Sequence, residues 1–158
     1  MKRNFYRMTS VIIFGLLWLT GAALAQDSEK PTRMKDLPPA VQTTVREQSK
    51  GAVLRGLAQE TKDGQTFYEA ELRVKGHGKD VLIDADGKVV EIEEQVAFNA
   101  LPPAVQAGLR KLAGKGRIML IESIKKADDA IVAYEAHVRT FGKLTEIKVG
   151  LDGQAVTQ

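Results

Sequence analysis

The chain has 158 residues and no cysteine, so no disulfide can reinforce its core. Lys2, Arg3 and Arg7 account for three of the 23 basic residues, and the remaining 20 balance the 20 acidic residues. This balance excludes the basic excess that is typical of nucleic-acid binding, so we expect no nucleic-acid partner.

The first 25 residues have the pattern of a cleavable secretory signal peptide. Basic residues precede an apolar run over residues 11–19, and Ala23 and Ala25 supply the small side chains that a signal peptidase needs. The apolar run is shorter than the roughly 20 residues that span a bilayer. We therefore predict cleavage after Ala25, a periplasmic or secreted location, and no stable membrane insertion of the mature protein.

Residues 26–35 are polar and lack periodicity, so we predict a flexible lead-in. The rest of the chain contains an internal repeat. An ordered set of matches predicts a duplication, with repeat 1 over residues 36–97 and repeat 2 over residues 98–158. The matched segments are residues 37–42 with 101–106, 68–70 with 134–136, and 86–87 with 152–153.

Each copy is predicted to begin with a helix, over residues 38–49 and 102–113. Prolines suit the first turn of a helix, where the backbone N–H has no intrahelical partner. Apolar residues recur every three or four positions and would line one face of each helix.

After each helix the apolar period changes to two, which predicts half-buried antiparallel strands. Residues 118–121 are apolar without alternation, which fits a central strand. Asp63-Gly64 and Asp86-Gly87 are strong hairpin signals. We therefore expect an α+β fold of two tandem units, each with one helix on an antiparallel sheet of three or four strands. Units of about 65 residues are marginal alone, so we expect them to share a core.

The segments LPPAVQ, YEAEL and DVLIDADGKVVE, repeated as LPPAVQ, YEAHV and LTEIKVGLDGQAV, resemble the PepSY-like family. The resemblance extends from Asp36 to the C-terminus. It implies exported tandem α-β-β-β units, and relatives of that family are described as peptidase or β-lactamase inhibitors and propeptide modules. A fold hosts many functions, so the resemblance implies an inhibitory role only loosely.

The sequence offers little catalytic chemistry. His77 lies between glycines, and His137 takes the outward strand position that Glu71 has in the first copy, so both are expected to be solvated surface histidines. Asp84 and Asp86 lack the remaining ligands of a calcium loop. We expect no catalytic residue, no metal ligand and no cofactor, and Glu93 is expected on the wet side of a strand.

One sheet face should carry the charged residues that alternate with the apolar ones, and it is the predicted protein-binding surface. The expected function is an exported, non-enzymatic binding module that docks another periplasmic protein, such as a peptidase, and could inhibit or chaperone it. The alternative is a periplasmic sensor or carrier that binds a small ligand or cation at the repeat junction. The predicted protein-binding residues are Glu69, Glu71, Arg73, Glu135, His137 and Arg139.

Overall fold

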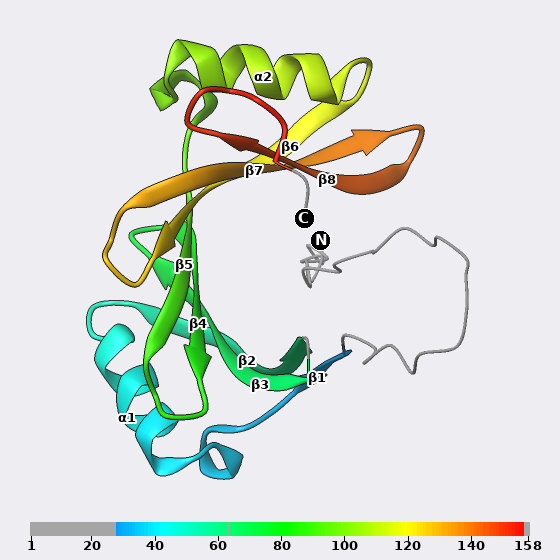
Figure 1. Ribbon diagram of the computed structural model, residues 1–158. Helices are drawn as coiled ribbons and strands as arrows, with labels where there is room; N and C mark the ends of the chain where they lie inside the picture. The colour runs from blue at the N-terminus through cyan, green and yellow to red at the C-terminus, as the bar shows by residue number, and fades with distance from the viewer. Residues whose placement is uncertain (1–27, 63, 157–158) are drawn as a thin grey trace, which may run out of the picture.

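The computed structural model describes residues 28–62 and 64–156, so the predicted signal peptide and its cleavage site lie outside the described residues. Each strand pairs antiparallel with the next one in the chain, and together they form one eight-stranded sheet (Figure 1). The strands are β1 (Ser28–Pro31), β2 (Val53–Lys62), β3 (Gln65–Val74), β4 (His77–Asp84), β5 (Val89–Gln95), β6 (Arg117–Lys126), β7 (Ile131–Thr140) and β8 (Lys143–Gly150).

The prediction of two tandem helix-on-sheet units was wrong, because all eight strands form one sheet. β5 pairs with β6, with Gln95 opposite Glu122 and Glu93 opposite Ile124, so the sheet continues across the middle of the chain. The physical reason is that an edge strand leaves a row of unpaired N–H and C=O groups, and pairing the two halves edge to edge satisfies those groups.

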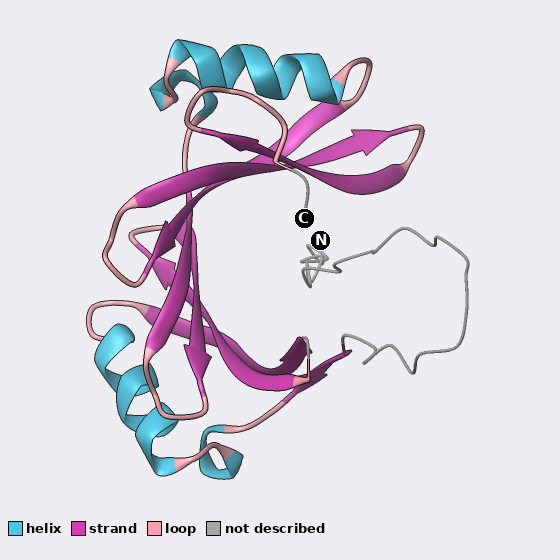
Figure 2. Cartoon of the chain, viewed as in Figure 1, coloured by secondary structure: helices cyan, strands magenta, loops and turns pink. Residues whose placement is uncertain are grey.

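Two helices cover the convex side of the curved sheet, α1 (Pro39–Gln48) near one end and α2 (Pro103–Ala113) near the other (Figures 1 and 2). Their bounds agree with the predicted helices to within one residue at each end. The LPPAVQ segment explains where α1 begins. Leu37 is buried, Pro39 is the first helical residue, and the Gln42 side-chain amide donates to the Leu37 carbonyl at 3.0 Å.

The second LPPAVQ segment makes the same contacts at α2, where the Gln106 side chain donates to the Leu101 carbonyl at 2.9 Å. Each helix then buries its apolar stripe against the strands beneath it. Val41 and Val45 of α1, like Val105 of α2, are fully buried.

The apolar residues form two clusters, and the prediction of one shared core was wrong. One cluster joins α1 to β3 and β4, and the other joins α2 to β6, β7 and β8. Each helix packs on strands of its own half, and the backbone pairing of β5 with β6 joins the two halves into one sheet.

The polar stretch predicted as a flexible lead-in contains regular structure from residue 28 onward. β1 pairs with β2, with Glu29 opposite Glu60, and a 3-10 turn follows over Met34–Asp36. The sequence pattern did not predict β1, because a strand of four residues is too short to display alternation. Of the other predicted turns, Asp86-Gly87 connects β4 to β5, whereas Asp63 lies outside the described residues.

Irregularities in strand pairing accompany the curvature of the sheet. The register shifts by one residue between Leu54 and Gly56, between Leu82 and Ile83, and between Ile118 and Leu120. Such β-bulges bend a strand and increase its twist. In Figure 1 the sheet curves into an open C, with the helices outside and one strand face inside. Within the described residues, neither helix has the length and apolar character needed to cross a membrane.

A close backbone contact fixes α2 on the sheet. A Cβ added to Gly108 would lie 2.1 Å from the carbonyl oxygen of Gly153, and one added to Gly153 would lie 2.1 Å from that of Ala104. Gly153 also has a φ of +76°, which favours glycine. In the first half, Thr44 donates instead to the Gly87 carbonyl at 2.5 Å.

Replacing Gly108 with Ala should therefore destabilise the protein, although alanine is normally preferred to glycine in a helix by about 1 kcal/mol. The added methyl group must push α2 away from the Gly153 turn. We expect a loss of roughly 1–3 kcal/mol in unfolding free energy, measured by urea denaturation. Lys111→Ala, at an exposed position on the same helix, is the control and should stay within about 0.5 kcal/mol. A Gly108→Ala variant as stable as the wild type would contradict this account.

Candidate functional site

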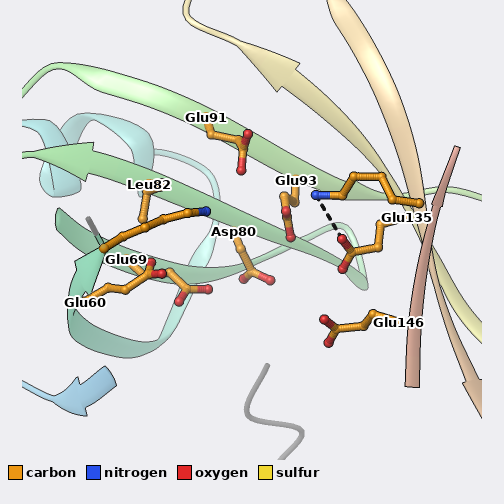
Figure 3. A pocket seen from close by; sticks show the side chains of 10 residues that line it. Glu60, Glu69, Asp80, Leu82, Glu91, Glu93, Glu135 and Glu146 are labelled. Carbon is orange, nitrogen blue, oxygen red and sulfur yellow. Dashed lines mark ion pairs between the residues drawn. The ribbon is translucent and has the colours of Figure 1, made fainter. Parts of the chain in front are cut away.

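The concave face of the sheet contains a pocket lined mainly by carboxylates (Figure 3). We call this pocket the acidic groove. Its lining combines seven acidic side chains with two lysines and a single apolar residue. The lining residues are Glu60, Lys62, Glu69, Asp80, Leu82, Glu91, Glu93, Glu135, Glu146 and Lys148.

Strand register explains why these side chains converge. Residues directly opposite each other on antiparallel strands point to the same face of a sheet. Glu71 lies opposite Asp80, and Asp80 lies opposite Glu93, so three carboxylates form a row across β3, β4 and β5. Glu122 lies opposite Glu135, which extends the acidic face across β6 and β7.

The structure brings four of the six predicted protein-binding residues together on the concave face. Glu69 and Glu71 on β3 and Glu135 and His137 on β7 share the face on which the acidic groove lies, because their register partners line it. Arg73 and Arg139 are exposed near the ends of those strands, and neither lines the groove.

The second-copy residues are not the solvated surface charges that the sequence suggests. Glu135 is 7% exposed and His137 is 4% exposed. Strand alternation correctly places them on the sheet face away from α2. The bending of the sheet then covers them with side chains from neighbouring strands. A surface histidine was therefore the wrong expectation for His137.

Three groove carboxyls are strongly perturbed by burial and by each other. Burial, then the charges of Asp80, Glu29, Glu93 and Glu71, raises the pKa of Glu69 to about 8. Burial and the negative charges of Glu122 and Glu71 raise the pKa of Asp80 to about 7. Both groups therefore carry protons near neutral pH.

Glu93 behaves in the same way. Burial and the charges of Glu135, Glu122 and Glu91 raise its pKa to about 8, against the opposing charge of Lys148. The sequence predicted a wet strand position for Glu93 without a perturbed pKa. That expectation was wrong because the curvature of the sheet places β5 close to carboxylates from the other half of the chain.

The imidazole of His137 faces three carboxylates. Its Nε2 atom lies 3.4 Å from Glu122 Oε2, 3.9 Å from Glu135 Oε1 and 3.9 Å from Glu146 Oε1. The interaction with Glu122 is the largest influence on the pKa of His137, which is raised although burial opposes the charge. Its Nδ1 atom is buried and has no hydrogen-bond partner among the described residues.

Lys148 provides part of the balancing positive charge. Its Nζ lies 3.1 Å from Glu135 Oε2, the interaction drawn in Figure 3. Burial disfavours the charged lysine, but Glu135 and the neighbouring carboxylates outweigh burial and raise its pKa. On the rim, Lys126 pairs with Glu91.

Two sets of side chains have ligand atoms close enough to hold a metal ion. The ligand atoms of Glu135, His137 and Glu146 lie within 4.8 Å of one another, as do those of Asp80, Glu93 and Glu122. Glu122 connects the sets, because it also faces His137. The acidic groove can therefore attract a cation or positively charged side chains.

Sequence reasoning did not select Glu122, Asp80 or Glu146 for the site. Glu122 offered a signal, because it is a charged residue inside the apolar stretch of residues 118–124. A buried charge requires a partner, so that position marks a polar site within a strand. Alternation with apolar residues predicted Asp80 and Glu146 on the polar side of their strands, but their closeness to Glu122 and His137 depends on strand pairing.

Solved structures similar to this chain share its fold at low sequence identity. A protein from Bacteroides eggerthii presumed to be periplasmic matches with a TM-score of 0.60 and 16% identity, covering 77% of this chain and 86% of that one. A BLIP-like protein from Bacteroides fragilis matches with a TM-score of 0.54 and 18% identity, covering 77% and 84%.

A DUF2874 family protein from Bacteroides uniformis also matches, with a TM-score of 0.57 and 17% identity, covering 76% of this chain and 86% of that one. No family model and no curated protein sequence matches the chain. The fold is therefore similar to that of BLIP-like and DUF2874 proteins.

The raised pKa of Glu69 predicts that stability falls as pH rises. The unfolded carboxyl titrates near 4.5 and the folded one near 8, so the folded state binds more protons between these values and loses stability across that window. Glu69→Gln should remove its share of the fall, on the order of 3 kcal/mol. Urea denaturation at pH 5 and pH 8 measures the difference.

The matched control is Glu47→Gln, on the exposed surface of α1, which should keep the wild-type fall between pH 5 and pH 8. The raised pKa values of Asp80 and Glu93 also make stability fall as pH rises. The pH dependence of stability in Glu69→Gln should therefore be smaller than in the wild type but still present. Equal slopes in Glu69→Gln and the wild type would refute the raised pKa.

Proposed function

We propose that this protein is an exported binding module whose acidic groove docks a basic segment of another exported protein. The observation that carries this proposal is the surplus of carboxylates in a recessed, concave site. Seven acidic residues and only two lysines line the groove. A positively charged partner would relieve the repulsion between these carboxylates and would be steered toward them in solution.

The size and lining of the groove favour side chains of a partner over a small organic ligand. Its cavity volume of about 80 Å³ is small beside the roughly 300–1,000 Å³ of typical ligand pockets. Leu82 is its one apolar lining residue. These features argue against the small-ligand carrier considered as the alternative, whereas they leave room for lysine or arginine side chains.

An exposed aromatic residue at one end of the sheet supports docking of a partner protein. Phe141 forms the turn between β7 and β8 at one end of the curved sheet (Figure 1), and it is 98% exposed. Its φ of 49° is a conformation that bulky residues rarely adopt. Aromatic residues are enriched among the anchors of protein interfaces, so we assign Phe141 an anchoring role for the partner at this end of the sheet.

The two exposed arginines extend the proposed surface. Arg73 and Arg139 lie beyond the carboxylates on β3 and β7, where they could contact acidic residues of the partner. The division into repeats over residues 36–97 and 98–158 also remains our proposal. It is supported by the matching packing of Gly87 near Ala40 and of Gly153 near Ala104.

Export is part of the proposal and has its own test. The basic and apolar pattern of residues 1–25 supports it, as does the similarity in fold to the B. eggerthii protein. Intact mass measurement of the protein recovered from the periplasm should give the mass of residues 26–158. A recovered protein that still contains Trp18 would contradict cleavage after Ala25.

Docking can be measured with a lysine decapeptide as a defined basic probe, in buffer containing a chelator. The wild type should bind the peptide, and the affinity should fall as salt concentration rises. The double variant Glu60→Gln/Glu91→Gln should bind the peptide roughly fivefold more weakly or worse, because it removes two carboxylates that line the groove while keeping the size of both side chains. Glu47→Gln on α1 controls for net charge and should bind like the wild type.

The same variants then apply to any protein captured from a periplasmic extract. Phe141→Asn should weaken the captured complex without loss of stability, since asparagine tolerates positive φ better than phenylalanine. The variant should leave decapeptide binding unchanged. Equal peptide affinity for the wild type and the double variant would remove the acidic groove as the docking site.

A further inference from the structure

One histidine and three carboxylates form a compact group at the β6–β8 end of the acidic groove. We call His137, Glu122, Glu135 and Glu146 the His137 cluster. They come from three neighbouring strands, and the register places Glu122 opposite Glu135 and His137 opposite Glu146. The cluster therefore rests on paired sheet backbone, which holds its side chains in fixed relative positions.

Hydrogen bonding among the described residues satisfies this histidine only in part, with one long contact at Nε2 and none at Nδ1. The three carboxylate oxygens lie 3.4 Å, 3.9 Å and 3.9 Å from His137 Nε2, beyond the 2.7–3.2 Å that is usual for an N–H···O bond. One Nε2–H can point to only one of them. At the other side of the ring, Nδ1 is buried, and no residue in the described part of the chain bonds to it. A buried imidazole normally has a hydrogen bond at each nitrogen.

Three members, Glu135, His137 and Glu146, have ligand atoms within 4.8 Å of one another, and Glu122 Oε2 lies 3.4 Å from the same imidazole nitrogen. A tetrahedral Zn²⁺ holds nitrogen at about 2.0–2.1 Å and carboxylate oxygen at about 2.0–2.2 Å, which separates neighbouring ligand atoms by roughly 3.4 Å. The Nε2 to Glu122 separation already has this value. Rotations of the Glu135 and Glu146 side chains by a few tenths of an ångström would bring their oxygens to it.

Burial adds a second reason to expect a cation. Glu122 is 4% exposed and Glu135 is 7% exposed, and buried charges are normally paired or bound to metal. Lys148 contacts only Glu135 within the cluster. One lysine and one imidazole leave the three carboxylates short of positive charge, and a divalent ion would supply it.

We propose that the His137 cluster binds one divalent transition-metal ion, of which Zn²⁺ is the probe, through His137 Nε2 and the carboxylates of Glu122, Glu135 and Glu146. The imidazole nitrogen of His137 determines which class of metal ion fits the site. Nitrogen ligands suit Zn²⁺, Cu²⁺ and Ni²⁺, whereas Ca²⁺ and Mg²⁺ prefer sites made only of oxygen. The expectation of no metal ligand followed from the absence of a sequence motif, and this site needs none, because strand pairing assembles it.

The test is calorimetric titration of the chelator-treated exported protein with Zn²⁺, without any protein or peptide partner. We expect one Zn²⁺ per chain and a melting temperature that rises with Zn²⁺ concentration. Glu146→Gln, a conservative change at the most exposed member of the cluster, should weaken binding at least tenfold. His137→Gln should do the same.

The chain provides a matched control, because it has only two histidines. His77→Gln, at an exposed position at the start of β4, should bind Zn²⁺ like the wild type. In wild-type protein, Zn²⁺ should shift the NMR ring signals of His137 and leave those of His77 in place, a readout that does not require the His137 variant to fold.

Three results would overturn the proposal: no stoichiometric Zn²⁺ binding, binding that is lost in His77→Gln instead of His137→Gln, or Ca²⁺ binding of equal strength that His137→Gln leaves unchanged. The last result would indicate a site of oxygen ligands alone. Peptide docking is measured in chelator and Zn²⁺ binding without peptide, so either proposal can fail while the other holds.

Discussion

The backbone pairing between β5 and β6 joins the two halves of the chain into one sheet, and the acidic groove depends on it. Gln95 lies opposite Glu122 in this pairing. The pairing brings Asp80 and Glu93 from the first half within 4.8 Å of Glu122 from the second. The two apolar clusters stay separate, so hydrogen bonds between strands, and no common core, connect the halves.

The carboxylates of the acidic groove destabilise the sheet that forms it. Like charges directly opposite on neighbouring strands are destabilising, and the row of Glu71, Asp80 and Glu93 places three such groups side by side. Burial raises the pKa of Glu93 to about 8, so part of the repulsion is relieved by protons. Perturbed carboxyls are concentrated at functional sites because function, and not stability, requires them there.

The two proposed activities use different parts of one surface. The β2–β5 side contributes Glu60, Glu69 and Glu91, which are placed for basic side chains (Figure 3). The β6–β8 side adds the imidazole of His137, which gives it nitrogen for metal binding. An ion bound there would lower the negative charge of the groove, so metal would weaken the attraction for a basic partner. The curvature of the sheet therefore couples metal binding to docking of the basic partner.

The sequence by itself determined the local elements. Proline position and apolar spacing located both helices, and alternation correctly placed Glu69, Glu71, Glu135 and His137 on the strand face away from the helices. These features depend on neighbours along the chain, which a sequence displays. Only the tertiary structure decided that the halves form one sheet, that its bulges bend it, and that His137 is buried beside Glu122. Those outcomes depend on the register and curvature of strands that are distant in the sequence, such as Glu91 opposite Lys126, 35 positions later, and no local pattern records them.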